Sequence, residues 1–269
     1  MPWVSITLEV DPAAADALSD ALLESGAQSV SLQGGTLSAL VHPAADANAL
    51  VADAARTLGI AAPAIALQAV RDEDWVRVTQ AQFAPLPIGR RLWIGASWHD
   101  APADRAAVRI DPGLAFGTGS HPSTRLVLSF LEENIRGGER VLDYGCGSGI
   151  LAIAAARLGA SLVDAADLDP QAVETTIGNA QNNQVAVKAM LPHMLTTAQY
   201  DVVVSNILSQ TLIVLEPVLA ARTVRGGRIA LSGILESQAA EVCAAYAPHF
   251  DAVVGAAAEG WALVEGTRR

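Results

Sequence analysis

The sequence predicts an α/β protein in which a small α+β domain precedes a doubly wound parallel β-sheet. Two observations carry this prediction. The first seventy residues alternate between short strands and two helices, whereas from residue 106 onward single strands and helices follow one another regularly. In addition, 51% of the 269 residues are hydrophobic, enough for a sizeable core. We expect a domain over 1–70, a connector over 71–105 and a second domain over 106–269.

The first domain is expected to follow the order βαββαβ. Apolar and polar side chains alternate from Val4 to Val10, as in a half-buried strand. Two helices with apolar faces end at Gly26 and Gly59. The other expected strands cover 28–32, 36–41 and 64–70. This order is the ferredoxin-like, split-βαβ arrangement. Since no clustered acids or histidines mark it as catalytic, we interpret it as a folding or docking module.

The connector is rich in aromatic side chains, which lie near Pro85 and Pro87. We interpret these side chains as packing between the two domains rather than as a ligand cage. They are Trp75, Phe83, Trp93 and Trp98.

The second domain alternates strands with helices. Val202–Val204 is apolar throughout, as expected of a strand covered on both faces. The expected strands cover 140–143, 162–167, 202–204 and 228–232, followed by two short closing strands. The expected helices cover 148–158, 170–182, 209–222 and 236–248.

Composition and charge argue against several classes of function. Seventeen basic against 28 acidic residues give a net charge of −11, so we expect no direct recognition of nucleic acid. Cys146 and Cys243 are far apart and neither belongs to a C-x-x-C pair, so we expect no disulfide framework and no metal site. No signal peptide or membrane-spanning stretch is evident. We therefore expect a cytoplasmic protein without a membrane partner, and a monomer by default.

A glycine-rich loop is the most informative feature of the second domain. It runs from Gly145 to Gly149 with the spacing G-x-G-x-G, directly after a strand that carries Asp143. Glycines allow a sharp turn and a close approach of a ligand to the backbone. A dinucleotide-binding loop would have its third glycine at Ile150, and a P-loop would continue with Gly-Lys-Ser/Thr. The spacing therefore argues against both.

Polar residues end two later strands. Asp167 lies eighteen residues after Gly149, where a carboxylate can accept hydrogen bonds from both hydroxyls of an adenosine ribose. Asp169 precedes Pro170, and we interpret it as a helix cap. Asn206 ends the apolar strand, and ligands of open α/β sheets bind at such strand ends. Its side-chain carbonyl can accept a hydrogen bond from a reacting amine or help to hold a cofactor.

A third polar segment precedes the glycine loop and leads into a helix. It runs from Asp111 to Thr124, and the helix start offers backbone N–H groups and the Thr124 hydroxyl to the same crevice. We interpret His121, beside Pro122, as a cap rather than as a general base.

With these motifs the chain resembles the class I S-adenosylmethionine-dependent methyltransferases. More closely, it is similar to the family that methylates large-subunit ribosomal protein L11. The similarity covers nearly the whole chain and includes the segments DPGLAFGTGSHPST, VLDYGCGSGILAIAAARLGA, DLDPQAV, DVVVSNIL and GGRIALSGIL, in that order. The resemblance implies a Rossmann-like domain with a seven-stranded, mostly parallel sheet and an N-terminal substrate-recognition domain.

The resemblance also implies an activity and a set of site residues. The activity is transfer of methyl groups from S-adenosylmethionine to lysine side chains and the N-terminal α-amine of L11. The implied cofactor contacts are Thr124, Gly145, Asp167 and Asn206. Our hypothesis is that Asn206 also orients the amine for catalysis, and that Phe116 excludes water.

Departures from the family pattern are modest. The usual GTGTHPTT reads GTGSHPST here, and the usual NILAGPL reads NILSQTL from Asn206 to Leu212. Two alternatives remain open: a lysine methyltransferase with another protein substrate, and a non-catalytic module that binds S-adenosylmethionine. Nucleic-acid methylation is disfavoured because Ile207 and Leu208 stand where a Pro-Pro-aromatic sequence would follow the asparagine.

Overall fold

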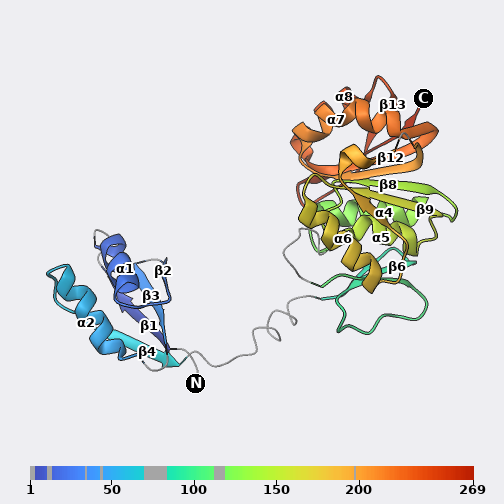
Figure 1. Cartoon of the computed structure of the whole chain (residues 1–269). Helices are drawn as coiled ribbons and strands as arrows, with labels where there is room; N and C mark the ends of the chain where they lie inside the picture. Colours follow the sequence, from blue (N-terminus) through green and yellow to red (C-terminus); the bar gives the residue numbers. More distant parts are fainter. Residues whose placement is uncertain are drawn as a thin grey trace. The chain divides into compact units, whose positions relative to one another are not determined.

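The computed structural model describes residues 4–10, 14–33, 35–42, 45–69, 84–111, 119–196 and 198–269. The chain divides into two compact units, residues 1–82 and 83–269, coloured blue to cyan and green to red in Figure 1. Within the described residues, none of the helices has the length and apolar character needed to cross a membrane.

The first unit is an antiparallel sheet with two helices. Its elements are β1 (Val4–Glu9), α1 (Ala15–Glu24), β2 (Ser29–Gln33), β3 (Thr36–Val41), α2 (Ala47–Thr57) and β4 (Ile65–Ala69). The strands lie in the order β2-β3-β1-β4, and β1 pairs with both β3 and β4. Leu18 and Leu22 of α1 and Val51 of α2 pack with Ile6 and Leu37 of the strands. This unit therefore has a core of its own.

Residues 84–105, which we assigned to the connector, lie in the second unit. They supply two strands of a three-stranded sheet, which consists of β5 (Leu86–Ile88), β6 (Leu92–Gly95) and β7 (Ala106–Arg109). Trp93 is 4% exposed, and the guanidinium of Arg109 lies 5.9 Å from the centroid of its ring. Trp93 thus packs inside the second unit, because β6 and β7 pair in parallel and bring the two side chains together. Trp75 and Phe83 are outside the described residues.

A seven-stranded sheet forms the centre of the second unit. Its strands are β8 (Arg140–Tyr144), β9 (Leu162–Ala166), β10 (Lys188–Met190), β11 (Tyr200–Asn206), β12 (Thr223–Leu235), β13 (Phe250–Ala258) and β14 (Trp261–Arg268). They lie in the order β10-β9-β8-β11-β12-β14-β13, with β14 antiparallel to both neighbours. The predicted mostly parallel, seven-stranded sheet is confirmed. The order reverses between β8 and β11, which is where open α/β sheets bind ligands.

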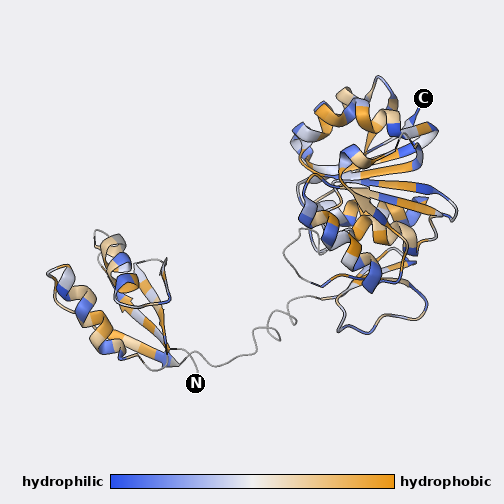
Figure 2. Ribbon diagram, in the orientation of Figure 1, coloured by the Kyte–Doolittle hydropathy of each residue, from blue (hydrophilic) through white to orange (hydrophobic). Residues whose placement is uncertain are grey.

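Helices cover both faces of this sheet (Figure 1). They are α4 (Pro122–Asn134), α5 (Ile150–Arg157), α6 (Pro170–Asn182), α7 (Ser209–Arg222) and α8 (Ala239–Tyr246), with short 3₁₀ helices η1 (Pro192–Met194) and η2 (Glu236–Gln238). One hydrophobic cluster joins α4, α5 and α6 to the sheet, and another joins α7 and α8 to it. The middle strands are accordingly mainly hydrophobic (Figure 2). Burial on both faces explains why Val202–Val204 shows no alternation.

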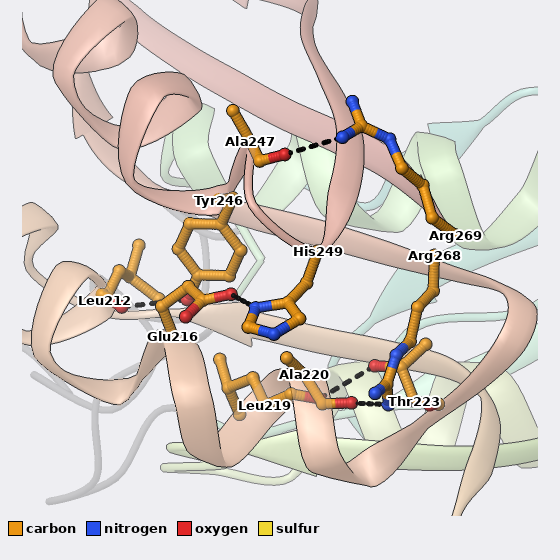
Figure 3. A network of polar contacts seen from close by, with 10 residues as sticks. All are labelled: Leu212, Glu216, Leu219, Ala220, Thr223, Tyr246, Ala247, His249, Arg268 and Arg269. Carbon is orange, nitrogen blue, oxygen red and sulfur yellow. Dashed lines mark hydrogen bonds and ion pairs between the residues drawn. The ribbon is translucent and has the colours of Figure 1, made fainter.

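A polar network ties α7 to α8 and β14 (Figure 3). His249 Nδ1 lies 2.8 Å from a carboxylate oxygen of Glu216, and the Tyr246 hydroxyl donates to the carbonyl of Leu212 at 2.8 Å. Arg268 donates to the carbonyl of Thr223, the first residue of β12. The opposite end of β12 pairs with Asn206. This part of the network therefore stabilises the edge of the sheet away from the predicted site.

Candidate functional site

The loop between β8 and α5 has a backbone that only glycine accommodates well. Gly145, Gly147 and Gly149 have φ angles of +85°, +53° and +79°. A Cβ atom on Gly145 would lie 2.4 Å from Cγ2 of Ile207, and one on Gly149 would lie 2.7 Å from Cγ2 of Thr176. All three glycines thus accommodate the turn, and Gly145 and Gly149 also allow the tight packing around it.

Asp143, two residues before the loop, caps α5 from a distance. The helix begins after Gly149, which has no side chain to cap it. Instead, Asp143 Oδ2 accepts a hydrogen bond from the backbone N–H of Ala152 at 3.1 Å. Its Oδ1 atom is buried without a hydrogen-bond partner. Complete burial raises the pKa of Asp143 to about 7, the charge of Asp167 acts in the same direction, and the Ala152 bond opposes the rise.

Asp167 follows β9 immediately and holds the loop. Its Oδ2 accepts from the N–H of Gly147 at 2.9 Å, and its Oδ1 accepts from the N–H of Asp169 at 3.0 Å. Each carboxylate oxygen has a second lone pair, so the half-buried side chain can still accept from a ligand hydroxyl. Asp169 accepts from the N–H of Gln171 at 2.9 Å, which confirms its predicted role as the cap of α6.

Two residues of α6 also fix the loop, and the sequence analysis missed both. The Thr176 hydroxyl donates to the carbonyl of Gly147 at 3.1 Å. The side-chain amide of Asn179 donates to the carbonyl of Ser148 at 2.8 Å. Thr176 and Asn179 are three residues apart and thus share one helix face. The signal that the sequence offered for these two residues was their polar character on a helix face that packs inward.

Asn206 and Thr124 are in direct contact. Asn206 Nδ2 donates to Thr124 Oγ1 at 3.1 Å. Asn206 ends β11, whose Ser205 donates to the carbonyl of Tyr144 at 2.6 Å and so ties β11 to the end of β8. Ile207 follows and packs against Gly145. The structure therefore brings the predicted residues Thr124, Gly145, Asp167 and Asn206 to the carboxyl edge of the sheet, beside the reversal of strand order.

His121 caps α4, as predicted. Its Nδ1 accepts from the N–H of Ser123 at 3.3 Å, and its ring meets that of Trp261 edge-on, with centroids 4.7 Å apart. These contacts fix the start of α4, in whose first turn Ser123 and Thr124 are buried. Phe116, which we expected to exclude water, is outside the described residues.

The comparison with protein families agrees with this geometry. The family described as ribosomal protein L11 methyltransferase matches residues 32–269. The chain belongs to this family. A ribosomal protein L11 methyltransferase from Thiobacillus denitrificans is 48% identical over an alignment of 296 positions, gaps included. The alignment covers 100% of both chains. That from Cupriavidus necator is 46% identical and covers 100% of this chain and 99% of its own.

A solved member of the ribosomal protein L11 methyltransferase family has the same fold. The crystal structure of ribosomal protein L11 methylase from Lactobacillus delbrueckii subsp. bulgaricus is 31% identical, with a TM-score of 0.64. It covers 70% of this chain and all of that one. The resemblance seen in the sequence motifs is therefore confirmed at the level of family and fold.

Proposed function

We propose that this chain transfers methyl groups from S-adenosylmethionine to lysine side chains and the N-terminal α-amine of ribosomal protein L11. The observation that carries the proposal is the convergence of the glycine loop, Asp167 and Asn206 at the strand-order reversal, in a chain of this family. The relatives that align over the full chain are named for L11, which supports this protein as the substrate.

The residues at the site fit the proposed cofactor. Gly145, Gly147 and Gly149 leave the loop backbone without side chains, so that a ligand can approach it closely. Asp167 retains acceptor capacity for the ribose hydroxyls, and Asp143 carries a buried carboxylate oxygen without a partner. Gly145 and Asp167 would hold the cofactor together with the Thr124–Asn206 pair. When bound, S-adenosylmethionine supplies an electrophilic methyl carbon on a positively charged sulfur.

The remaining task of the enzyme is to present a neutral amine. A lysine side chain has a pKa near 10.4 and is almost fully protonated at neutral pH. A crevice that removes the amine from water favours its neutral form. Asn206 Nδ2 is engaged by Thr124, which leaves Oδ1 to accept an N–H of the amine. This hydrogen bond orients the lone pair, and alignment of reacting atoms supplies much of the acceleration in such transfers.

Intact mass spectrometry of purified L11, incubated with the full chain and S-adenosylmethionine, tests the proposal. We expect mass gains in steps of about 14 Da, the mass of one added CH₂ unit per transfer, as required by replacing N–H with N–CH₃. Asp167→Ala should abolish the gains. Asp169→Ala, which removes a neighbouring carboxylate that only caps α6, should retain them.

The same experiment separates the alternatives. Cofactor binding measured by calorimetry without any mass gain would move the substrate to another protein or make the chain a binding module. An absence of cofactor binding would contradict the methyltransferase proposal itself.

A further inference from the structure

Two leucines lie at the ends of the strands that border the site. Leu208 follows Asn206, the last residue of β11, by two positions, and Leu235 is the last residue of β12. These strands pair in parallel. The segments at their ends are also in contact, because Gly233 packs on the carbonyl of Ile207 so closely that a Cβ atom there would clash. Both leucines therefore lie at the carboxyl edge of the sheet, on the Asn206 side of the site.

The side chains of both leucines are open to solvent. Leu208 is 72% exposed and Leu235 is 42% exposed. Single exposed leucines are common on protein surfaces, so exposure alone assigns them no role. Their position at helix starts is more informative. Leu208 is the N-cap of α7, and Leu235 is the N-cap of η2.

Leucine is a poor residue for a helix start. A good N-cap side chain accepts a hydrogen bond from an N–H of the first turn, so serine, threonine, aspartate and asparagine are preferred there and leucine is strongly disfavoured. Asp46, His121 and Asp169 accept such bonds at the starts of α2, α4 and α6. The side chain of Leu208 makes none to α7. Because local preferences are broken mainly at functional sites, the exposed leucines at this edge indicate a role in binding.

We propose that Leu208 and Leu235 contact the aliphatic stem of the substrate lysine while its amine reaches Asn206. This inference rests on the proposed function and concerns how the same site distinguishes its substrates. A lysine amine stands on four methylene groups, which pack readily along apolar surface. An amine at Asn206 brings this stem to the carboxyl edge of the sheet, where the two leucines present apolar side chains. Their contact removes apolar surface of both partners from water.

The N-terminal α-amine of L11 provides an internal comparison. It is attached directly to the backbone and has no methylene stem. In the proposed function both kinds of amine react with the same bound S-adenosylmethionine beside the same Asn206. The two leucines should therefore accelerate transfer to lysine and contribute little to transfer to the α-amine.

Leu208→Ser replaces the apolar side chain with a good helix cap. We expect the initial rate of transfer to lysine, relative to that to the α-amine, to fall by roughly tenfold or more, the discrimination usual for a small apolar contact in a pocket. The Tm should rise by roughly 2 °C or more, since the serine hydroxyl caps α7. Peptide mass mapping of L11 at early times, with saturating S-adenosylmethionine, measures both transfers. Thermal unfolding measures the Tm, and its rise would exclude misfolding as the cause of slower transfer.

Three further variants complete the test. Leu162→Ser is the matched control, because Leu162 is 37% exposed but begins β9 and so lies at the opposite, amino edge of the sheet. This variant should keep the wild-type ratio of the two rates. Leu208→Met keeps an apolar side chain, so it should retain most of the ratio and show no gain in Tm. Leu235→Ser should lower the ratio as Leu208→Ser does.

Several outcomes would overturn the inference. A wild-type ratio in both Leu208→Ser and Leu235→Ser would show that the leucines do not contact the stem. Equal slowing of both transfers would assign them instead to general docking of L11. Transfer to the α-amine alone in the wild type would also overturn it, and with transfer to lysine alone the rate relative to Leu162→Ser takes the place of the ratio. These results leave methylation of L11 intact, whereas a wild-type chain that methylates no amine of L11 would contradict the proposed function and this inference with it.

Discussion

Two ionisable side chains beneath the glycine loop are removed from water. Asp143 is fully buried and Cys146 is 5% exposed. Burial raises the pKa of Asp143 to about 7 and the pKa of Cys146 to about 12. Below neutral pH the Asp143 carboxyl and the Cys146 thiol beneath the loop are therefore both uncharged. Above it, Asp143 becomes the charged neighbour of Asp167.

The raised pKa of Asp143 makes stability depend on pH. In the folded protein the carboxyl keeps its proton up to about pH 7, whereas in the unfolded chain it loses it near 3.8. The stability that this group contributes is therefore complete below pH 3.8 and decreases as the pH rises to about 7, by at most about 1.4 kcal/mol per pH unit. The side chain of Asp143→Asn does not titrate. The stability of this variant relative to the wild type should therefore be greater at pH 8 than at pH 5.

Urea unfolding of both proteins at the two pH values measures this difference. Asp169→Asn changes an exposed carboxylate and serves as the control. A stability difference between Asp143→Asn and the wild type that stays constant with pH would contradict the prediction.

Cys146 should be unreactive in the native protein despite its place in the loop. Its thiol is buried and remains protonated at pH 8, and the thiolate is the reactive form. Burial raises the pKa of Cys243 as well, but Cys243 is only half-buried and so remains the more accessible of the two. Treatment with iodoacetamide at pH 8 should therefore add a single label, at Cys243, and a second label only after unfolding. Peptide mass mapping checks the sites, and early labelling of Cys146 would count against its burial.

At the scale of elements, regular patterns predicted the fold and irregular ones did not. Alternation from Val4 and the apolar run at Val202–Val204 correctly indicated strands, since both reflect burial on one or two faces. The strand β10 has three residues, too few to show a period, and was missed. Thr176 was missed as well: its place on an inward-packing face of α6 was a signal, but its partner in the loop depends on how α6 packs and cannot be read from α6 alone.

Gly145→Ala tests the loop as an element. The variant combines a strained φ of +85° with a Cβ only 2.4 Å from Ile207 Cγ2. Gly226→Ala is the matched control, since Gly226 has a φ of +76° and no atom within 4 Å of a built Cβ. Gly226→Ala should lose about 1 kcal/mol of stability from backbone strain. Gly145→Ala should lose more, and should bind S-adenosylmethionine at least roughly tenfold more weakly, a difference of about 1.4 kcal/mol.

Thermal unfolding and calorimetry check the two variants side by side. Equal effects of both substitutions would show that the backbone conformation alone matters, and that the contact with Ile207 does not.

At the scale of the whole molecule, charge is unevenly divided between the two units. Residues 1–82 hold ten acidic and three basic residues, a net charge of −7 out of the total of −11. Such a unit attracts basic partners and accelerates their association. This agrees with the predicted role of the N-terminal domain in substrate recognition.

Removal of the first unit tests that role. Residues 83–269 contain two hydrophobic clusters of their own, so this part should fold and bind S-adenosylmethionine with unchanged affinity. Its kcat/KM for L11 should decrease at least roughly tenfold, which corresponds to about 1.4 kcal/mol of lost recognition. Calorimetry and steady-state kinetics measure the two quantities. Full kcat/KM in the shortened chain would assign recognition to the second unit.

The many hydrogen bonds that hold the glycine loop have a thermodynamic consequence for the ligand. Asp167, Thr176 and Asn179 together bind Gly147 and Ser148 through the backbone. Ordering a backbone residue costs about 1–2 kcal/mol, and here that entropy is lost when the protein folds. An incoming ligand thus meets a pre-organised surface. Its association should have a small entropic penalty and leave the amide-exchange protection of the loop almost unchanged.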